Sequence, residues 1–177
     1  MINREAALEK LKSYQPDSYQ YQHALYSEAI MRALAPRFEA DPDVWGLCGL
    51  LHDIDFPLTK HTPEQHGLKA KELLEGIDGM TDEIVNAIMA HNSEHTGVQP
   101  SCDLDYALRC SETVTGLICA AALMRPTGME GMEPKSIKKK MKDKAFAAAV
   151  SRENIRECEK IGLPLDDFLA IAIKAMS

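Results

Sequence analysis

The feature that most restricts the fold is an apolar run that ends on a histidine and an aspartate. Residues 45–51, WGLCGLL, contain no charged side chain, and they lead directly into His52 and Asp53. Burying an imidazole and a carboxylate without partners costs roughly a few kcal/mol each, and more if the carboxylate stays charged. We therefore expect His52 and Asp53 to have partners inside the protein that offset this cost.

Nearly every segment of the chain has the periodicity of an amphipathic helix, and the alternation typical of a strand is missing. Several expected helices begin at typical capping residues, namely Asp17 or Ser18, Asp41 before Pro42, and Thr81. The stretch Thr62-Pro63-Glu64-Gln65 resembles a capping box, and Phe56-Pro57 is expected to begin a loop. The expected helices cover residues 4–14, 17–35, 42–53, 63–76, 81–91, 103–124, a basic segment after 134, 151–160 and 164–176.

The length and composition favour one soluble domain. A chain of 177 residues is most simply a single all-α domain. A formal charge of −7 and a pI of about 5.4 argue against a nucleic-acid polymer as partner. The five cysteines form no CxxC pair and indicate reduced thiols. No segment approaches the ~18 apolar residues of a membrane span, and the first residues lack an apolar leader. We expect a cytoplasmic protein that does not bind membranes.

Histidines and acids fall on the apolar faces of the expected helices. A single histidine on such a face is more often a core residue than a ligand, but several together are harder to explain in that way. A buried group of imidazoles and carboxylates is what one or two divalent cations would compensate. The predicted metal ligands are His23, His52, Asp53, His66, His91 and Glu112.

The order of these residues resembles the HD superfamily of metal-dependent phosphohydrolases, and within it the stand-alone HDIG-type proteins. The matching stretches are QHALYSEAIMRALA, LCGLLHDIDF, QHGLKAKELL, EIVNAIMAHN and LDYALRCSETVTGLI, within about residues 17–125. The resemblance implies an HD-like helical bundle on which the C-terminal helices of 134–177 pack. It also implies one metal held by His23, His52, Asp53 and Glu112, and a second held by His66 and His91 with Asp53 as the bridge.

The chain departs from the family pattern at two positions. Asp55 stands where HDIG proteins have glycine, and Glu112 stands where the family usually has aspartate. Asp55 is a plausible acceptor for the N–H of a ligand histidine. Glutamate reaches one methylene farther than aspartate; the alternatives, Asp103 and Asp105, lie a turn or more away on the same expected helix.

The predicted chemistry follows from this ligand set. Imidazoles and carboxylates without thiolate suit iron, manganese or another first-row metal. Two such ions that share a water would generate hydroxide near neutral pH, which can attack a phosphate ester. His52 and Asp53 are the predicted catalytic pair, and the expected substrate is a small phosphate ester, such as a nucleotide or dinucleotide.

Basic residues indicate where that substrate could bind. The stretch KSIKKKMKDK, residues 135–144, places Lys138 and Lys142 one helical turn apart in an otherwise acidic chain. Arg109 precedes Glu112 on the same expected helix, and His95 follows the helix that carries His91. These four residues are predicted substrate contacts. The competing interpretation of the lysines is a solvated helix face.

Three other functions are compatible with parts of the pattern. HNSEH, residues 91–95, matches the H-x-x-E-H motif of inverted zinc peptidases, which requires a continuous helix. A di-iron oxygenase on the same scaffold is a second alternative, and a non-catalytic nucleotide-binding sensor is a third. The peptidase motif would leave the other predicted ligands unexplained.

Overall fold

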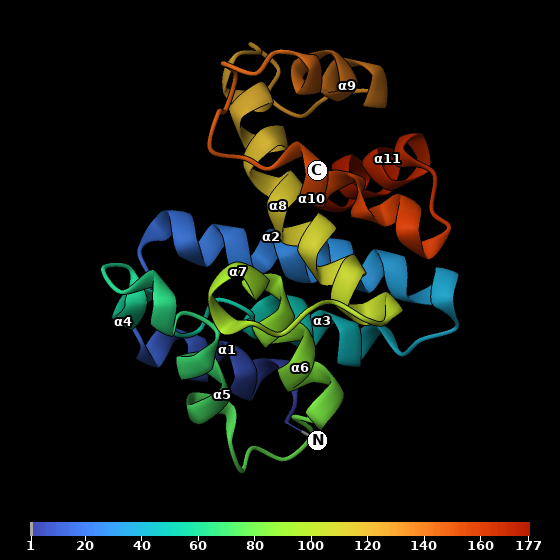
Figure 1. The fold of residues 1–177 in the computed structure, drawn as a ribbon. Coiled ribbons are helices and arrows are strands. Elements are labelled where there is room, and N and C mark those ends of the chain that lie inside the picture. Colours follow the sequence, from blue (N-terminus) through green and yellow to red (C-terminus); the bar gives the residue numbers. More distant parts are fainter. Residues whose placement is uncertain (1) are drawn as a thin grey trace.

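The computed structural model describes residues 2–177, and no strand occurs among them, which confirms the all-α prediction (Figure 1). None of the described helices is long and apolar enough to cross a membrane. The elements are α1 (Arg4–Ser13), α2 (Ser18–Leu34), η1 (Ala35–Phe38), α3 (Pro42–Leu51), α4 (Phe56–Thr59), η2 (Pro63–Gln65), α5 (Leu68–Leu74), α6 (Asp82–His91), α7 (Ser93–Thr96), α8 (Asp103–Leu123), α9 (Pro134–Lys142), α10 (Arg152–Arg156), η3 (Glu157–Ile161) and α11 (Leu165–Met176).

Local capping residues set the starts of several helices, among them the three that the sequence predicts. Asp17 forms a capping box with Gln20 at the start of α2. Asp41 accepts a hydrogen bond from the backbone of α3, which begins at Pro42, and Thr81 caps α6 in the same way. Each cap satisfies an N–H group that the helix itself leaves without a partner.

The segment between α3 and α6 differs from the prediction. Phe56-Pro57 begins the single-turn helix α4 rather than a loop, since proline is well suited to the first turn of a helix. Thr62 makes no capping hydrogen bond, and α5 begins only after Gly67, whose φ of +88° favours glycine. His66 therefore lies in an extended turn and does not head a helix.

A glycine allows α2 and α3 to pack almost backbone to backbone. A Cβ atom at Gly49 would stand 2.7 Å from the carbonyl oxygen of Ser27, which is closer than real Cβ contacts. Around this contact the core contains Ile30, Leu50 and Leu51, none of which is exposed. The close approach of the two helices brings His23 of α2 next to His52 at the end of α3.

The long helix α8 connects the N-terminal helices to the C-terminal ones. Figure 1 shows α8 crossing α2 in the middle of the view and ending beside α9 at the top. α8 also contacts α3, α6, α10 and α11. One cluster of buried apolar side chains consequently extends from Ala7 to Met176.

Candidate metal centre

The structure brings the six predicted ligands together. His23 comes from α2, His52 and Asp53 from the end of α3, His66 from the turn before α5, His91 from the end of α6 and Glu112 from α8. They form two groups, and within each group one possible ligand atom per residue lies within 4.8 Å of the others. The first group is His23, His52 and Glu112, and the second group is Asp53, His66 and His91.

The first group's histidines bind protein acceptors through Nδ1. Nδ1 of His52 lies 2.8 Å from the carbonyl oxygen of Gly49, which can only accept. Nδ1 of His23 lies 2.8 Å from Thr115 Oγ1, whose own hydrogen goes to the carbonyl oxygen of Glu112 at 2.7 Å. Both rings therefore carry hydrogen on Nδ1, which leaves a lone pair on Nε2 when the ring is neutral.

The second group repeats this arrangement with different acceptors. Nδ1 of His66 lies 2.9 Å from Asp55 Oδ1, and Nδ1 of His91 donates to the carbonyl oxygen of Ile88. Ligand histidines in metal sites typically donate their other N–H to a carboxylate or a backbone carbonyl. All four imidazoles thus direct Nε2 toward the centre of the cluster.

The Nε2 atoms meet in pairs at short distances. They are 3.1 Å apart between His23 and His52, and 3.0 Å apart between His66 and His91. Neutral rings in these orientations would oppose two lone pairs, which repel, and a cation that accepts both lone pairs removes the repulsion. The donor set therefore fits divalent metal ions.

The Asp53 carboxylate lies between the two groups. Its Oδ1 is 3.5 Å from Nε2 of His52, 3.2 Å from that of His66 and 3.4 Å from that of His91. Its Oδ2 is 3.6 Å from Nε2 of His23. Asp53 thus offers oxygens to both groups at once.

Burial and charge shift the pKa values within the centre. Burial lowers the pKa of His52 to about 3, although Asp53 acts to raise it. Burial likewise raises the pKa of Glu112, against the opposing effect of His91 and His23. For His66 the effect of burial is outweighed by hydrogen bonds with Asp53 and Asp55, which raise its pKa to about 10. Burial would raise the pKa of Asp53, but the surrounding histidines hold it well below its usual value.

Asp55 is fully buried behind His66 and has a second role that the sequence did not reveal. Besides His66, it accepts the N–H of Gly67 at 2.8 Å and that of Ala70 at 3.0 Å through Oδ2. Asp55 therefore takes the place of a local cap for α5. The same carboxylate fixes the start of this helix and the orientation of the His66 ring.

The alternative acids to Glu112 lie outside the cluster. Asp105 Oδ2 accepts the N–H of Ser101 at 2.8 Å and the Asn86 amide at 3.3 Å, which secures the start of α8. Asp103 is exposed. Glu112 is the acid of α8 that joins His23 and His52.

Arg109 lies in a different setting from the predicted substrate contact. Its Nε donates to Glu157 at 2.6 Å, and its Nη1 donates to the carbonyl oxygen of Ala90 at 2.8 Å and to Ser93 at 2.9 Å. Its Nη2 donates to Asn154 at 3.2 Å. The buried guanidinium joins the end of α6 to the C-terminal segment, and the substrate contact stays a prediction.

The other three predicted substrate contacts also lie elsewhere. Lys138 pairs with Asp166 of α11 at 2.8 Å, and Lys142 is exposed near the end of α9. His95 is exposed, and its Nδ1 lies 3.0 Å from Asn92 Oδ1. Neither lysine lines the pocket beside the metal centre, and the predicted substrate contacts stay predictions. The peptidase motif of residues 91–95 is interrupted too, since α6 ends at His91 and Asn92 is not helical.

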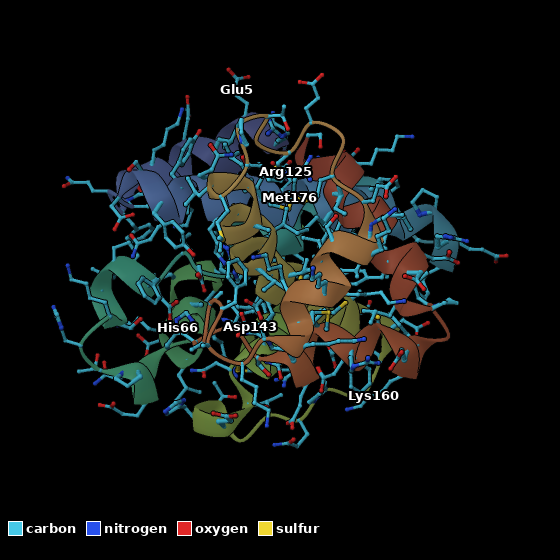
Figure 2. All side chains as sticks on the ribbon, turned by 90° about the horizontal axis from the view of Figure 1, so that it is seen from above. Glu5, His66, Arg125, Asp143, Lys160 and Met176 are labelled. Atoms are coloured by element: carbon cyan, nitrogen blue, oxygen red, sulfur yellow. The ribbon has the colours of Figure 1, made fainter. Side chains whose placement is uncertain are left out.

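A pocket of about 360 Å³ opens beside the first group. Its walls include Tyr19 and His23 of α2, Glu112 and Thr113 of α8, and the segment 149–151. The labelled His66 lies among the green segments that follow α3, apart from the labelled Lys160 in the C-terminal part (Figure 2). The pocket was missed because none of the residues that the C-terminal segment supplies belongs to a recognisable motif.

Comparison with known proteins identifies the family. The HD domain model matches residues 21–122, more than half of the chain, and the matched segment contains all six residues of the cluster. Searches of curated proteins and of solved structures found no significant match. The HDIG subtype remains a prediction. With its HD-type arrangement of histidines and acids on a helical bundle, the chain belongs to the HD domain family.

Proposed function

We propose that this protein is a metal-dependent phosphohydrolase that cleaves a phosphate ester of a small molecule. The observation that carries the proposal is the convergence of four imidazole Nε2 atoms on one aspartate, in two groups that each suit a divalent ion. Membership of the HD domain family, whose members are generally metal-dependent phosphohydrolases, supports it.

The residues that would hold two ions are the members of the two groups. His23, His52 and Glu112 would hold one, and His66 and His91 would hold the other, with Asp53 between them. The cluster contains no thiol among the described residues, so iron, manganese or another first-row metal fits it. When bound, such ions lower the pKa of a water nucleophile and offset the charge of a phosphoryl group.

The protein's own contribution is to orient the ligands. Thr115 and the Gly49 carbonyl fix the rings of the first group, and Asp55 and the Ile88 carbonyl fix those of the second. The exposed fraction of the His52 side chain is only 1%, against 18% for Asp53. A substrate would approach from the side of His23 and Glu112, which line the pocket.

The test combines elemental analysis of the purified protein with a screen for phosphate release. We expect iron, manganese or a similar metal at up to two equivalents, and phosphate release from at least one phosphate ester. Chelation should abolish the release, and returning the metal should restore it. Oxygen uptake by the iron form, with no phosphate release from any ester, would favour the oxygenase; failure to retain any metal would favour the sensor.

A further inference from the structure

The pocket beside the first group is continuous with the candidate metal centre. His23 and Glu112 belong to both, so a molecule whose phosphate lies at the centre would extend into this space. The volume of about 360 Å³ is typical of small-molecule sites. Ala149, Val150 and Ser151 of the C-terminal part also line the pocket.

The walls of the pocket are polar without being basic. Apart from His23 and Glu112, they present hydroxyl groups of Tyr19, Thr113 and Ser151, the amide of Asn154 and the apolar Val150. The described lining residues include no lysine and no arginine. Glu112 is the only Asp, Glu, Lys or Arg side chain among the described lining residues, so a ligand would meet this carboxylate beside the proposed ions.

Two arginines adjoin lining residues of the pocket, and the N–H groups at the end of each guanidinium already donate within the protein. Arg152 follows Ser151 in the chain, and its Nη1 donates to the carbonyl oxygens of Ala147 at 2.7 Å and Val150 at 2.6 Å. Arg109 is paired with Glu157. A second or third phosphate in the pocket would therefore bring negative charge toward Glu112, and no lysine or arginine among the described lining residues could pair with it.

Arg109 also determines how Asn154 faces the pocket. The guanidinium can only donate, so the atom of Asn154 that it contacts is the acceptor Oδ1. The Nδ2 group of Asn154 is thereby left to donate to a ligand. Ser151 Oγ accepts the backbone N–H of Asn154 at 3.1 Å, which leaves its hydroxyl hydrogen to donate as well.

These donors suit the oxygens of a sugar or a similar alcohol. Resting on the proposed function, we infer that this pocket binds the leaving group of the substrate, and that this group is uncharged and rich in hydroxyls. The substrate class is then a phosphomonoester, such as a nucleoside monophosphate or a sugar phosphate, in preference to a nucleoside di- or triphosphate or a dinucleotide.

Gly116 keeps the pocket open. A Cβ atom at this position of α8 would stand 3.1 Å from Val150 Cγ2 and 3.9 Å from the hydroxyl oxygen of Tyr19. One added methyl group would therefore narrow the pocket between two of its walls. Gly116→Ala tests the pocket without changing any of the six proposed ligands.

The experiment measures binding by calorimetry to the metal-loaded protein, with metal in excess over nucleotide. The probes are adenosine mono-, di- and triphosphate and inorganic phosphate. We expect the monophosphate to bind at least about tenfold more tightly than the triphosphate, a difference that one uncompensated interaction readily produces. Equal or tighter binding of the triphosphate would overturn the inference.

Variants distinguish ligand binding in the pocket from phosphate binding at the metal centre. Gly116→Ala and Asn154→Ala should each weaken monophosphate binding about tenfold, in line with the cost of overpacking or of a lost hydrogen bond, and leave inorganic phosphate binding unchanged. Lys138→Ala is the control and should change neither. If both pocket variants bind the monophosphate like the parent, the pocket assignment is wrong. Tight binding of the monophosphate without its hydrolysis would instead contradict the proposed function and leave the pocket assignment standing.

Discussion

The two groups of the candidate metal centre differ in the charge state that the protein favours for their side chains. In the first group, burial lowers the pKa of His52 to about 3 and raises that of Glu112, so both residues are driven toward their neutral forms. In the second group, the pKa of His66 is raised to about 10 and that of Asp53 is held well below its usual value, so both are driven toward their charged forms.

This difference indicates how each group exists without metal. In the second group, a proton on Nε2 of His66 can donate to Asp53 Oδ1 at 3.2 Å, and it occupies the place that a cation would take. In the first group, the neutral His52 offers His23 only a lone pair at 3.1 Å. We therefore expect a bound metal to remove the repulsion between the two lone pairs of the first group directly. In the second group a metal must first displace the proton of His66.

The largest expected effect is that of Asp53→Ala, which removes the residue shared by both groups. Phosphate release should fall by more than the ~10–100-fold that loss of a supporting partner costs at metal sites. His52→Ala should be similarly severe, and His66→Ala and His91→Ala less so, because they leave the first group intact. Steady-state kinetics on a substrate found in the screen would measure this.

The control for Asp53→Ala is Asp103→Ala, which removes an exposed aspartate outside the cluster. It should retain full activity. If Asp53→Ala also keeps the turnover of the parent, the histidine–aspartate pair is only structural and the proposed mechanism is wrong.

Removal of metal should produce the next largest effect. A ligand at 100 times its Kd stabilises the folded state by about 2.7 kcal/mol, which raises the Tm of a chain of this size by roughly 5–10 °C. Calorimetry before and after chelation measures the difference.

Glu112→Gln sharpens this test of the first group. Because burial raises the pKa of Glu112, its ionised form destabilises the metal-free fold at neutral pH. The variant should melt at a higher temperature than the parent without metal, and should gain less when metal is added. A metal-dependent gain equal to that of the parent would show that Glu112 is not a ligand.

A smaller effect is expected from pH, acting through the second group. In the metal-free protein the raised pKa of His66 gives stability that is complete below about pH 6.5, the usual value for histidine, and that is lost as the pH rises toward about 10. Metal must displace this proton, so affinity at the second group should rise about tenfold per pH unit over the same range. Competition with a metal-binding dye between pH 6.5 and 9 measures the slope.

Asp55→Asn provides the matched variant for the pH prediction. It removes one of the two carboxylates that raise the pKa of His66. The rise of metal affinity with pH should therefore level off at a lower pH in this variant than in the parent. A metal affinity that is independent of pH in the parent would contradict the ion pair between Asp53 and His66.

The smallest effect is expected for Lys138→Ala. Lys138 is partly exposed and paired with Asp166, and exposed pairs contribute about 0–1 kcal/mol to stability. The KM should stay within about twofold of the parent, a difference well below the tenfold that 1.4 kcal/mol produces. A clearly raised KM in steady-state kinetics would instead support the substrate contact that the basic segment suggests.

Features that depend on neighbouring residues were predictable from the sequence. The caps at Asp17, Asp41 and Thr81 act within one turn, so the starts of α2, α3 and α6 follow from local sequence. Helical spacing also places His23 and Glu112 on inward faces, and the structure brings them together.

Features that depend on distant partners were not predictable in the same way. The capping box at Thr62 is absent because Asp55 satisfies the start of α5 from 12 and 15 residues away. The pocket depends on how the segment before α10 packs against α8, which no periodicity specifies. One signal was available: Gly116 lies inside the long helix α8, where glycine costs about 1 kcal/mol relative to alanine and often has a packing or functional reason.

The ion pair of Arg109 has a consequence for the order in which the protein is completed during synthesis. Arg109 belongs to the segment that matches the HD domain, whereas its partner Glu157 lies 48 residues later and beyond that segment. Chains fold from the N-terminus as they leave the ribosome, and a buried charge without its partner is strongly destabilising. The link from the end of α6, which carries His91 and accepts hydrogen bonds from Arg109, to the C-terminal segment can therefore form only after Glu157 has emerged, so we expect the proposed second metal group to gain its full support late in synthesis.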